Sequence, residues 1–229
     1  MSKRWGPCSS YSARRHTRDR CRMPSTLASS EAADSKYVQT VNKQDDFARS
    51  LFAEIDAGGN PDLDQLRGTS GVRFEPTTWN ELLALIEDGS APALGQLGRS
   101  PLGLKHYWDR CREIKTKEFV SMLDYLYVHV FGVPSIKTGD GRLQAQLPSG
   151  FLETEKISWM ENDFPYWYEP GIEHHCLWST TPLSEDRIKQ EIVRHRGAGY
   201  ETAWFQNPVV LMSCPQIWHV HILSRPVQG

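Results

Sequence analysis

The fold is decided by residues 216–224, which read QIWHVHILS. Side chains alternate between the two faces of a β-strand, so Trp218, Val220 and Ile222 share one wholly apolar face. His219 and His221 share the other face, about 7 Å apart at a rise of ~3.3 Å per residue. The stretch therefore predicts a strand with one buried face, and the imidazole pair on its other face is the first candidate functional site.

Three segments upstream of this stretch also have the composition of strands, and one segment between them has the period of a helix. The predicted strands are residues 151–160, 172–179, 200–206 and 216–224, and the predicted helix is residues 183–195. These elements follow one another in the order β-β-α-β-β. The simplest arrangement for this order is an antiparallel meander with the one inserted helix packed on it.

The first half of the chain has helical periodicity instead. Thr78 followed by Glu81 has the spacing of a capping box, which predicts a helix over residues 77–87. Apolar residues at helical spacing and breaks rich in Gly and Pro mark the other segments. They are helices over 36–56 and 103–131, a linker over 57–75, and irregular chain over 132–150 with a turn at 139–141.

Together these elements predict an α+β fold. The chain begins with a disordered basic extension over residues 1–35, followed by a short helix and linker over 36–75. A single α+β domain then spans residues 76–229. Within this domain an N-terminal helical subdomain, residues 76–131, packs on the antiparallel β-meander of residues 151–225.

Composition narrows the class of protein. The chain has 229 residues, of which 39% are hydrophobic, so it can form one domain with a sizeable core. Five scattered cysteines without a CxxC pair are typical of reduced thiols in an intracellular protein. Because the sequence has no run of about 18 apolar residues and no secretory signal, we expect no membrane partner.

Charge is unevenly distributed along the chain. Residues 1–24 hold seven Lys and Arg against one Asp, although the whole chain has a formal net charge of −2. The remainder is therefore acidic, and we expect no nucleic-acid partner. The expected location is the cytoplasm. The Arg- and Ser-rich start allows two interpretations. It is a mitochondrial presequence, or it is an unstructured extension, which includes the case that translation begins at Met23.

A first group of candidate site residues lies between the first two predicted strands. Asn162 and Asp163 precede a proline and predict a tight, hydrogen-bonded turn, which either holds a ligand hydroxyl or simply joins two strands. His174 and His175 are adjacent on a strand, so they point to opposite faces. The inward one is either a site residue or a hydrogen-bonded core histidine.

The second group is centred on His219 and His221, the two catalytic candidates. A neutral imidazole is a competent nucleophile and proton carrier near neutral pH, and a second imidazole on the same face can orient it. Asn207 and Ser213 lie on the loop that leads into this strand and offer hydrogen-bond donors to a phosphate or an oxyanion. The pattern favours a phosphorylated small-molecule ligand and requires no cofactor.

The same histidines allow two other interpretations. A His-x-His strand with a third ligand, from His174, His175 or Asp163, would suit zinc or iron. This metal interpretation ranks below the phosphate interpretation because no carboxylate has a compelling spacing. Alternatively, His219 and His221 are structural histidines packed under aromatic side chains.

Several blocks of sequence, taken in order, resemble the fungal N-acetylglucosamine-induced protein family. The blocks are residues 79–83, 97–101, 162–166, 171–179, 204–208 and 219–221. Together they cover roughly residues 76–225. The resemblance implies a fungal cytoplasmic protein, tied to the amino-sugar response, and it implies no particular reaction.

A looser similarity is to the histidine-triad superfamily of nucleotide hydrolases and transferases, which makes the expected meander histidine-triad-like. On that pattern His219 falls on the nucleophile position and forms a phosphohistidine, while Asn207 and Ser213 fall on phosphate-contacting positions. Ile217 stands where that superfamily usually has its first histidine, and His174 or His175 would have to compensate across the sheet.

The leading hypothesis is therefore a protein that binds a nucleotide or nucleotide sugar at the His-x-His strand, with hydrolase or nucleotidyltransferase activity through His219. A second hypothesis is a non-catalytic regulatory or binding protein of the amino-sugar response, which Ile217 favours. The third is the metal-dependent site.

Overall fold

The computed structural model describes residues 27–227, with side chains from residue 36 onward, and residues from Tyr37 belong to one compact unit. The helices are α1 (Leu27–Asp56), α2 (Trp79–Asp88), α3 (Ala91–Leu94), α4 (Pro101–Glu113), α5 (Met122–Phe131) and α6 (Glu185–Arg196). The strands are β1 (Ser135–Lys137), β2 (Leu143–Ala145), β3 (Ile157–Glu161), β4 (Glu173–Ser179), β5 (Tyr200–Phe205) and β6 (Trp218–Pro226). Single helical turns are η1 (Leu63–Leu66), η2 (Ile114–Glu118), η3 (Phe151–Glu153), η4 (Gly197–Gly199) and η5 (Val209–Leu211). The α+β prediction is confirmed: helices precede a four-stranded antiparallel sheet with one inserted helix.

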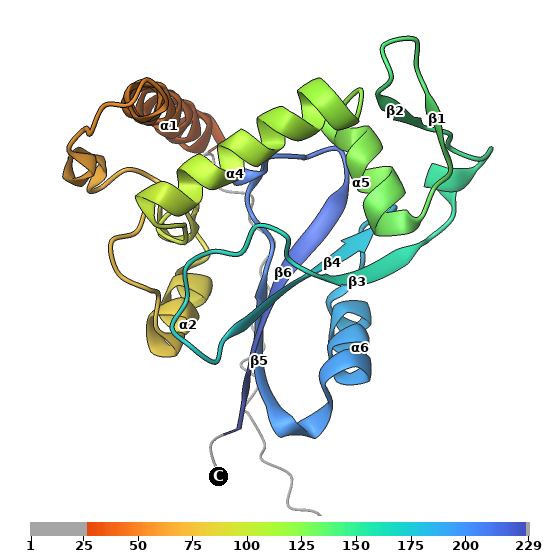
Figure 1. Ribbon diagram of the computed structural model, residues 1–229. Coiled ribbons are helices and arrows are strands. Elements are labelled where there is room, and N and C mark those ends of the chain that lie inside the picture. The colour runs from red at the N-terminus through yellow and green to blue at the C-terminus, as the bar shows by residue number, and fades with distance from the viewer. Residues whose placement is uncertain (1–26, 228–229) are drawn as a thin grey trace, which may run out of the picture. The chain divides into compact units, whose positions relative to one another are not determined.

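Strands β3 to β6 form this sheet in the order β3-β4-β6-β5, and Figure 1 shows β6 inside it. The predicted meander is therefore wrong, because a meander would place β5 between β4 and β6. Helix α6 explains the difference. A helical crossover returns the chain to the end at which β4 began, so β5 runs parallel to β4. The last strand then fills the gap between them and is antiparallel to both.

The two faces of β6 differ as predicted. Val220 and Ile222 are fully buried on the apolar face, where they pack with Ile188 and Ile192 of α6. Burial of aliphatic side chains of this size stabilises a fold by about 1.5–3 kcal/mol each. The opposite face carries His219 and His221, and we call it the histidine face.

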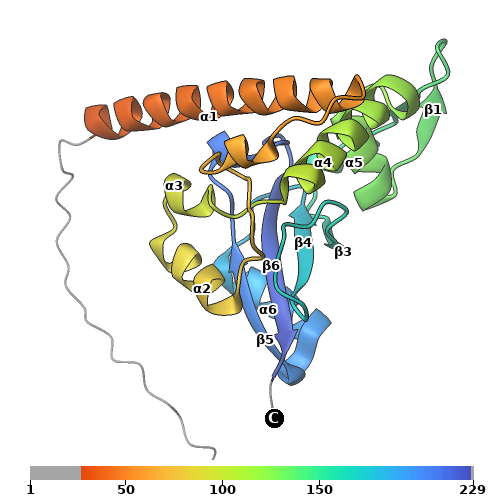
Figure 2. The ribbon, with the colours of Figure 1, turned by 60° about the vertical axis from the view of Figure 1, so that its left-hand side comes forward.

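Helices from the first half of the chain cover the histidine face. On the β5 side, Trp79 and Leu82 of α2 pack against Phe205 and Leu223, and Figures 1 and 2 show α2 beside β5. On the opposite side, α5 packs against β3 and against a cluster that includes Ile217. These two contacts position the elements that surround the candidate site.

The predicted continuous helix over residues 103–131 is broken in the structure. Between α4 and α5 the chain makes a π-helical turn, η2, and Phe119 then pairs with Leu143 in an isolated β-bridge. Ser121 caps α5, because its hydroxyl accepts a hydrogen bond from the backbone N–H of Asp124. A serine in this position competes with helix continuation by satisfying the first free N–H groups of a new helix.

The connecting segments are more ordered than predicted. Within residues 57–75, Leu66 is fully buried and Val72 pairs with Arg99 in a parallel bridge. Residues 132–150 contain the hairpin of β1 and β2, with the predicted turn at its tip. Helix α1 begins at Leu27, upstream of the predicted residue 36. The rest of the predicted basic extension, residues 1–26, lies outside the described part.

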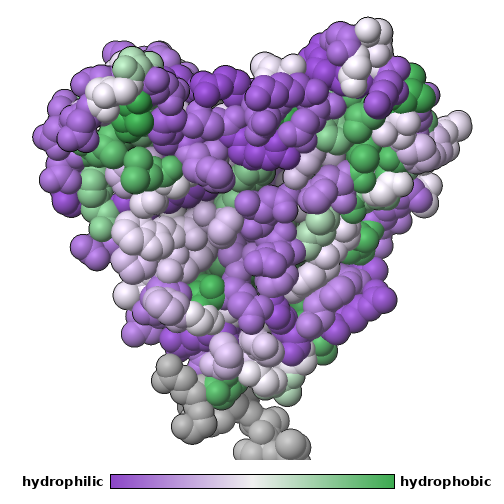
Figure 3. Space-filling view, in the orientation of Figure 1, coloured by the Kyte–Doolittle hydropathy of each residue, from purple (hydrophilic) through white to green (hydrophobic). Residues whose placement is uncertain are grey.

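The surface has no extended apolar band on the face drawn in Figure 3, where hydrophobic side chains lie in small groups among hydrophilic ones. Exposed large hydrophobic residues are scattered over several elements, for example Leu102 on α4, Ile136 on β1 and Val193 on α6. Among residues 27–227, no helix combines the length and the hydropathy that a membrane crossing requires.

Candidate functional site

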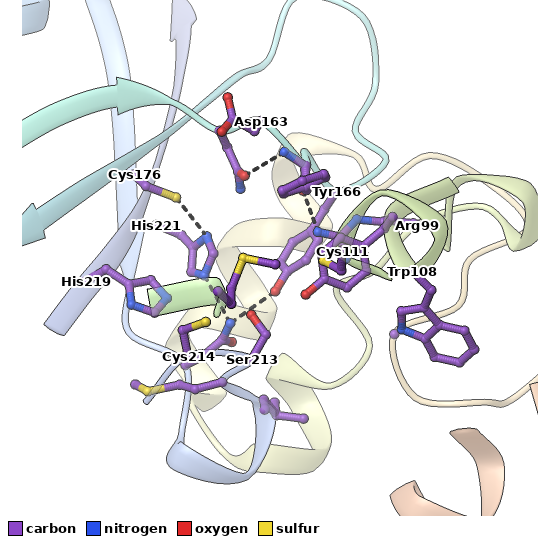
Figure 4. A pocket seen from close by; sticks show the side chains of 18 of the residues that line it. Arg99, Trp108, Cys111, Asp163, Tyr166, Cys176, Ser213, Cys214, His219 and His221 are labelled. Carbon is purple, nitrogen blue, oxygen red and sulfur yellow. Dashed lines mark hydrogen bonds between the residues drawn. The ribbon is translucent and has the colours of Figure 1, made fainter. Parts of the chain in front are cut away.

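A cavity of about 670 Å³ lies between the histidine face and the elements that cover it, and Figure 4 shows it from close by. This volume is typical of small-molecule sites. Most of the predicted site residues line it, together with residues that the sequence did not single out. The lining includes Arg99, Tyr107, Cys111, Asn162, Asp163, Tyr166, Cys176, Asn207, Ser213, His219 and His221.

A chain of hydrogen bonds fixes the protons of two buried histidines. The backbone N–H of Tyr166 donates to Nδ1 of His174 at 3.2 Å, so the ring proton of His174 is on Nε2. That N–H donates to Nδ1 of His221 at 2.9 Å, so the proton of His221 is also on Nε2. The side-chain nitrogen of Asn207 lies 3.0 Å from this Nε2 and the same distance from the hydroxyl oxygen of Tyr166; turning the amide over by 180° places its carbonyl oxygen there as the acceptor of the proton.

Burial keeps both of these imidazoles neutral. Desolvation, followed by the charge of Arg99, lowers the pKa of His174 to about 3. Desolvation and the charges of His174, His219 and Arg99 lower the pKa of His221 well below its usual value. Every ring nitrogen of the two residues has a partner. His174 and His221 thus form a neutral, hydrogen-bonded pair that is built into the sheet, and the side-chain nitrogen of Asn162 also lies 3.1 Å from Nε2 of His174.

His219 is bonded differently. Its Nδ1–H donates to the backbone carbonyl of Ile217 at 3.0 Å, and its ring stacks on Trp178 with centroids 4.4 Å apart. A carbonyl only accepts, so the Nε2 nitrogen of neutral His219 carries a lone pair. No described residue is a hydrogen-bond partner of that nitrogen. Burial lowers the pKa of His219, opposed by the Ile217 hydrogen bond, so the lone pair is available at neutral pH.

Ile217 occupies the position where the resemblance calls for a further histidine. Its side chain is buried in the cluster under α5, and its backbone carbonyl sets the tautomer of His219. His174 contacts His221 and not His219, so it does not replace the missing side chain in the predicted way. Orientation of His219 is therefore supplied by the main chain and by the stack on Trp178.

Arg99 is the main cavity residue that the sequence did not select as a site residue. Its guanidinium Cζ lies 4.2 Å from the ring centroid of Tyr107 and 4.9 Å from that of Tyr166. One Nη donates to the carbonyl of Phe164, while the Nε is buried and has no acceptor. No carboxylate among the described residues pairs with this cation. The only signal in the sequence was its place in one of the resembling blocks.

Ser213 lines the cavity as predicted, next to Tyr107 in the same lining. The neighbouring thiols are not reactive. Burial raises the pKa of Cys111, and it raises the pKa of Cys214 to about 11. Because a thiolate is the reactive form of cysteine, these two side chains are protonated and inert at neutral pH.

The predicted turn at Asn162 and Asp163 is present. The side-chain oxygen of Asn162 accepts from the backbone N–H of Phe164 at 2.9 Å. Oδ2 of Asp163 accepts from the hydroxyl of Tyr125 at 2.7 Å and lies 3.1 Å from Nε2 of His129. The turn therefore ties the end of β3 to α5 and forms one wall of the cavity.

His174 and His175 point to opposite faces, as the strand period requires. Only His174 reaches the His221 network. His175 lies on the other face, 2.6 Å from Nη2 of Arg196 through its Nδ1, and its ring packs near Trp159. The predicted role of His175 at the same site is wrong, because the sheet separates it from His219.

One group among the described residues has the make-up of a metal site: His174, Cys176 and His221, whose ligand atoms lie within 4.8 Å of one another. Cys176 is opposite His221 in the sheet, which sequence spacing alone did not reveal. A metal on Nε2 of His174 would require a proton on its Nδ1, which already faces the N–H of Tyr166. The backbone N–H of Tyr166 and the Nδ1–H of His174 would then point at each other. These residues therefore do not fit a metal ion.

The fold and the site define an α+β protein with a cavity at a face of buried, neutral histidines. The chain belongs to the family described as "Protein of unknown function (DUF3605)", whose model matches residues 78–225. It is 26% identical over 162 residues to "Uncharacterized protein YPL067C" of Saccharomyces cerevisiae, covering 63% of this chain and 77% of that one.

Two further similarities were found. The chain is 28% identical over 95 residues to "N-acetylglucosamine-induced protein 1" of Candida albicans, covering 34% of this chain and 37% of that relative. The match thus spans little more than a third of the Candida protein. The solved structure "Crystal Structure of HTC1" has 25% sequence identity and a TM-score of 0.43, covering 65% of this chain and 84% of that one.

Proposed function

We propose that the cavity binds a phosphorylated small molecule, such as a nucleotide or nucleotide sugar, and that His219 attacks its phosphorus. One observation carries this proposal: His219 lines the cavity, and the Nε2 lone pair of its neutral ring has no hydrogen-bond partner among the described residues. The other ring nitrogen is occupied by a backbone carbonyl, which also stabilises positive charge that develops on the ring during attack.

The chemistry follows from these positions. Nε2 of His219 forms a bond to phosphorus, and the bond from phosphorus to the leaving oxygen or nitrogen breaks. The leaving group takes a proton from solvent. Water then attacks the phosphohistidine, the N–P bond breaks, the attacking water returns a proton, and neutral His219 is regenerated. Ser213 and Asn207 also line the cavity, and their hydroxyl and amide groups are neutral hydrogen-bond donors of the kind that phosphoryl oxygens require.

A second candidate function is non-catalytic binding, as in a regulatory protein of the amino-sugar response. The observation that favours it is the closed hydrogen-bond network of His174 and His221, which leaves no spare proton beside His219 for a leaving group. The printed name of the Candida relative, an N-acetylglucosamine-induced protein, suggests the same biological setting.

The two candidates are separated by a labelling experiment. The purified protein is incubated with ³²P-labelled nucleoside phosphoramidates and dinucleotides, and acid-labile, base-stable phosphoprotein is measured together with product. We expect label in the wild-type protein and none in His219→Asn. His106→Asn is the matched control, because His106 is an exposed residue of α4 outside the cavity. Equal turnover by wild type and His219→Asn would refute the nucleophile assignment, and ligand binding without any turnover would favour the regulatory candidate.

A further inference from the structure

We infer that Arg99 is a second anion-binding point, separate from His219, and that the ligand therefore carries two anionic groups. The inference rests on the proposed function for the group at His219 and adds a second requirement to the ligand. Its chemical class is a bisphosphate, or a phosphate joined to a carboxylate, and not a simple phosphate monoester.

The first argument is the unused hydrogen-bonding capacity of Arg99. A guanidinium has five N–H donors, and the structure gives one Nη an acceptor, the carbonyl of Phe164. The Nε is buried without any acceptor. Leaving a buried donor unsatisfied costs about 1–3 kcal/mol, and more for a charged group. The other Nη has no acceptor among the described residues and is not enclosed, so it is the donor that an anion in the cavity can reach.

The second argument is the contrast with another arginine on the same wall. Arg112 also lines the cavity, but it is exposed, and its guanidinium already donates to the carboxylate of Asp109 at 2.7 Å. Its charge is satisfied within the protein. Arg99 has no such carboxylate, and its half-buried position weakens the competition from water.

The third argument is that Arg99 is held in place before a ligand binds. Its guanidinium packs against the rings of Tyr107 and Tyr166, and one Nη is fixed by the carbonyl of Phe164. The planar fork of arginine forms bidentate pairs with phosphate or carboxylate when its orientation is fixed in this way. Little side-chain entropy is then lost on binding.

The fourth argument is distance. Three successive contacts separate the two points: ring centroids of His219 and His221 are 5.5 Å apart, those of His221 and Tyr166 are 5.5 Å apart, and Arg99 Cζ is 4.9 Å from Tyr166. Figure 4 shows Arg99 and His219 on opposite sides of Tyr166 and His221. The charge of Arg99 contributes to the lowered pKa of His221 but not to that of His219. Arg99 and His219 are therefore two separate contact points, connected only through His221 and Tyr166.

A ladder of defined phosphates tests this inference. The probes are inorganic phosphate, propyl phosphate, pyrophosphate and propane-1,3-diyl bisphosphate, and dissociation constants are measured by calorimetry on wild type, Arg99→Gln and the matched control Arg112→Gln. For wild type we expect the bisphosphate to bind about tenfold or more tightly than propyl phosphate, a difference of about 1.4 kcal/mol. We expect this tighter binding of the bisphosphate relative to propyl phosphate to be lost in Arg99→Gln and kept in Arg112→Gln.

The outcomes separate this inference from the proposed function. If propyl phosphate binds and His219 is labelled, but the bisphosphate has no advantage in wild type, only the second anion point is refuted. The same conclusion follows if the advantage survives in Arg99→Gln. If no phosphate binds at all, both proposals fail. Should Arg99→Gln not fold, Arg99→Lys retains the cation without the planar fork, and an advantage equal to that of wild type in Arg99→Lys would refute bidentate binding.

Discussion

The buried imidazole of His174 should make the stability of this protein strongly dependent on pH. Its pKa is about 3 in the folded state, against 6.5 for a free histidine, because burial disfavours the charged form. The folded pKa is lowered, so protons bind preferentially to the unfolded chain below pH 6.5. Stability is therefore full above this value and falls as the pH is lowered toward 3.

The magnitude follows from these two values. Between pH 7 and pH 5 the unfolded histidine becomes almost fully protonated while the folded one stays neutral. The free energy of unfolding then falls by about 2 kcal/mol from His174 alone. His221 acts in the same direction, because its pKa is also lowered by burial. The buried pair thus predicts acid sensitivity well above the range in which carboxylates titrate.

Urea unfolding at pH 7, 6 and 5 measures this effect. Wild type is compared with His174→Gln, which removes the titrating group, and with the exposed-site control His106→Asn. His174→Gln should be less stable than wild type at pH 7. Between pH 7 and pH 5 its free energy of unfolding should fall by about 2 kcal/mol less than that of wild type. The titration of groups that do not contact His174 cancels in this comparison. Parallel pH profiles for wild type and His174→Gln would refute the assignment of a neutral, buried His174.

Three further predictions concern the elements around the site. Ser121→Ala removes the N-cap of α5 and should lower the free energy of unfolding by about 1 kcal/mol in urea. Asn207→Leu removes the side-chain amide that contacts the His221 ring and the hydroxyl of Tyr166, and should lower the free energy of unfolding in urea by about 1–3 kcal/mol. Gly98→Ala places a Cβ 2.1 Å from the backbone oxygen of Gly71, so the adjoining loops must shift; we expect a lower melting temperature, and an unchanged one would contradict the close approach.

Local signals in the sequence predicted much of the secondary structure. The predicted N-cap at Thr78 is present, because its hydroxyl accepts from the N–H of Glu81, whereas the carboxylate of Glu81 pairs with Arg73. The two-residue period around Val220 correctly separated the apolar face from the histidine face. Such features depend on neighbours in the chain, and a sequence displays them directly.

The order of the strands depended on information that is not local. No local pattern in residues 200–224 indicates which strand pairs with β4. The answer depends on the direction in which α6 returns the chain and on the gap that this leaves for β6. The break between α4 and α5 was missed for a related reason. Phe119 leaves the helix to pair with Leu143, a partner that no helical pattern can reveal.

Only part of the candidate site was predicted, again because some of its contacts are not local in the sequence. His219, His221, Asn207 and Ser213 lie close together in the sequence, and the structure brings all four to one cavity. Cys176 and Arg99 reach that cavity from distant segments, through strand register and a loop. Their contribution could be seen only once the chain was folded.

Two imidazoles on one strand face have different chemistry because of where the neighbouring strand ends. The pairing of β5 with β6 stops at Phe205 opposite His221, so His221 is enclosed between β4 and β5, where His174 and Asn207 complete its hydrogen bonds. His219 lies beyond that last pair and has a strand on one side only, at Trp178. Its Nε2 is therefore left without a partner at the cavity. One strand of ordinary β geometry yields both a structural histidine and a nucleophile candidate, and the length of β5 decides which is which.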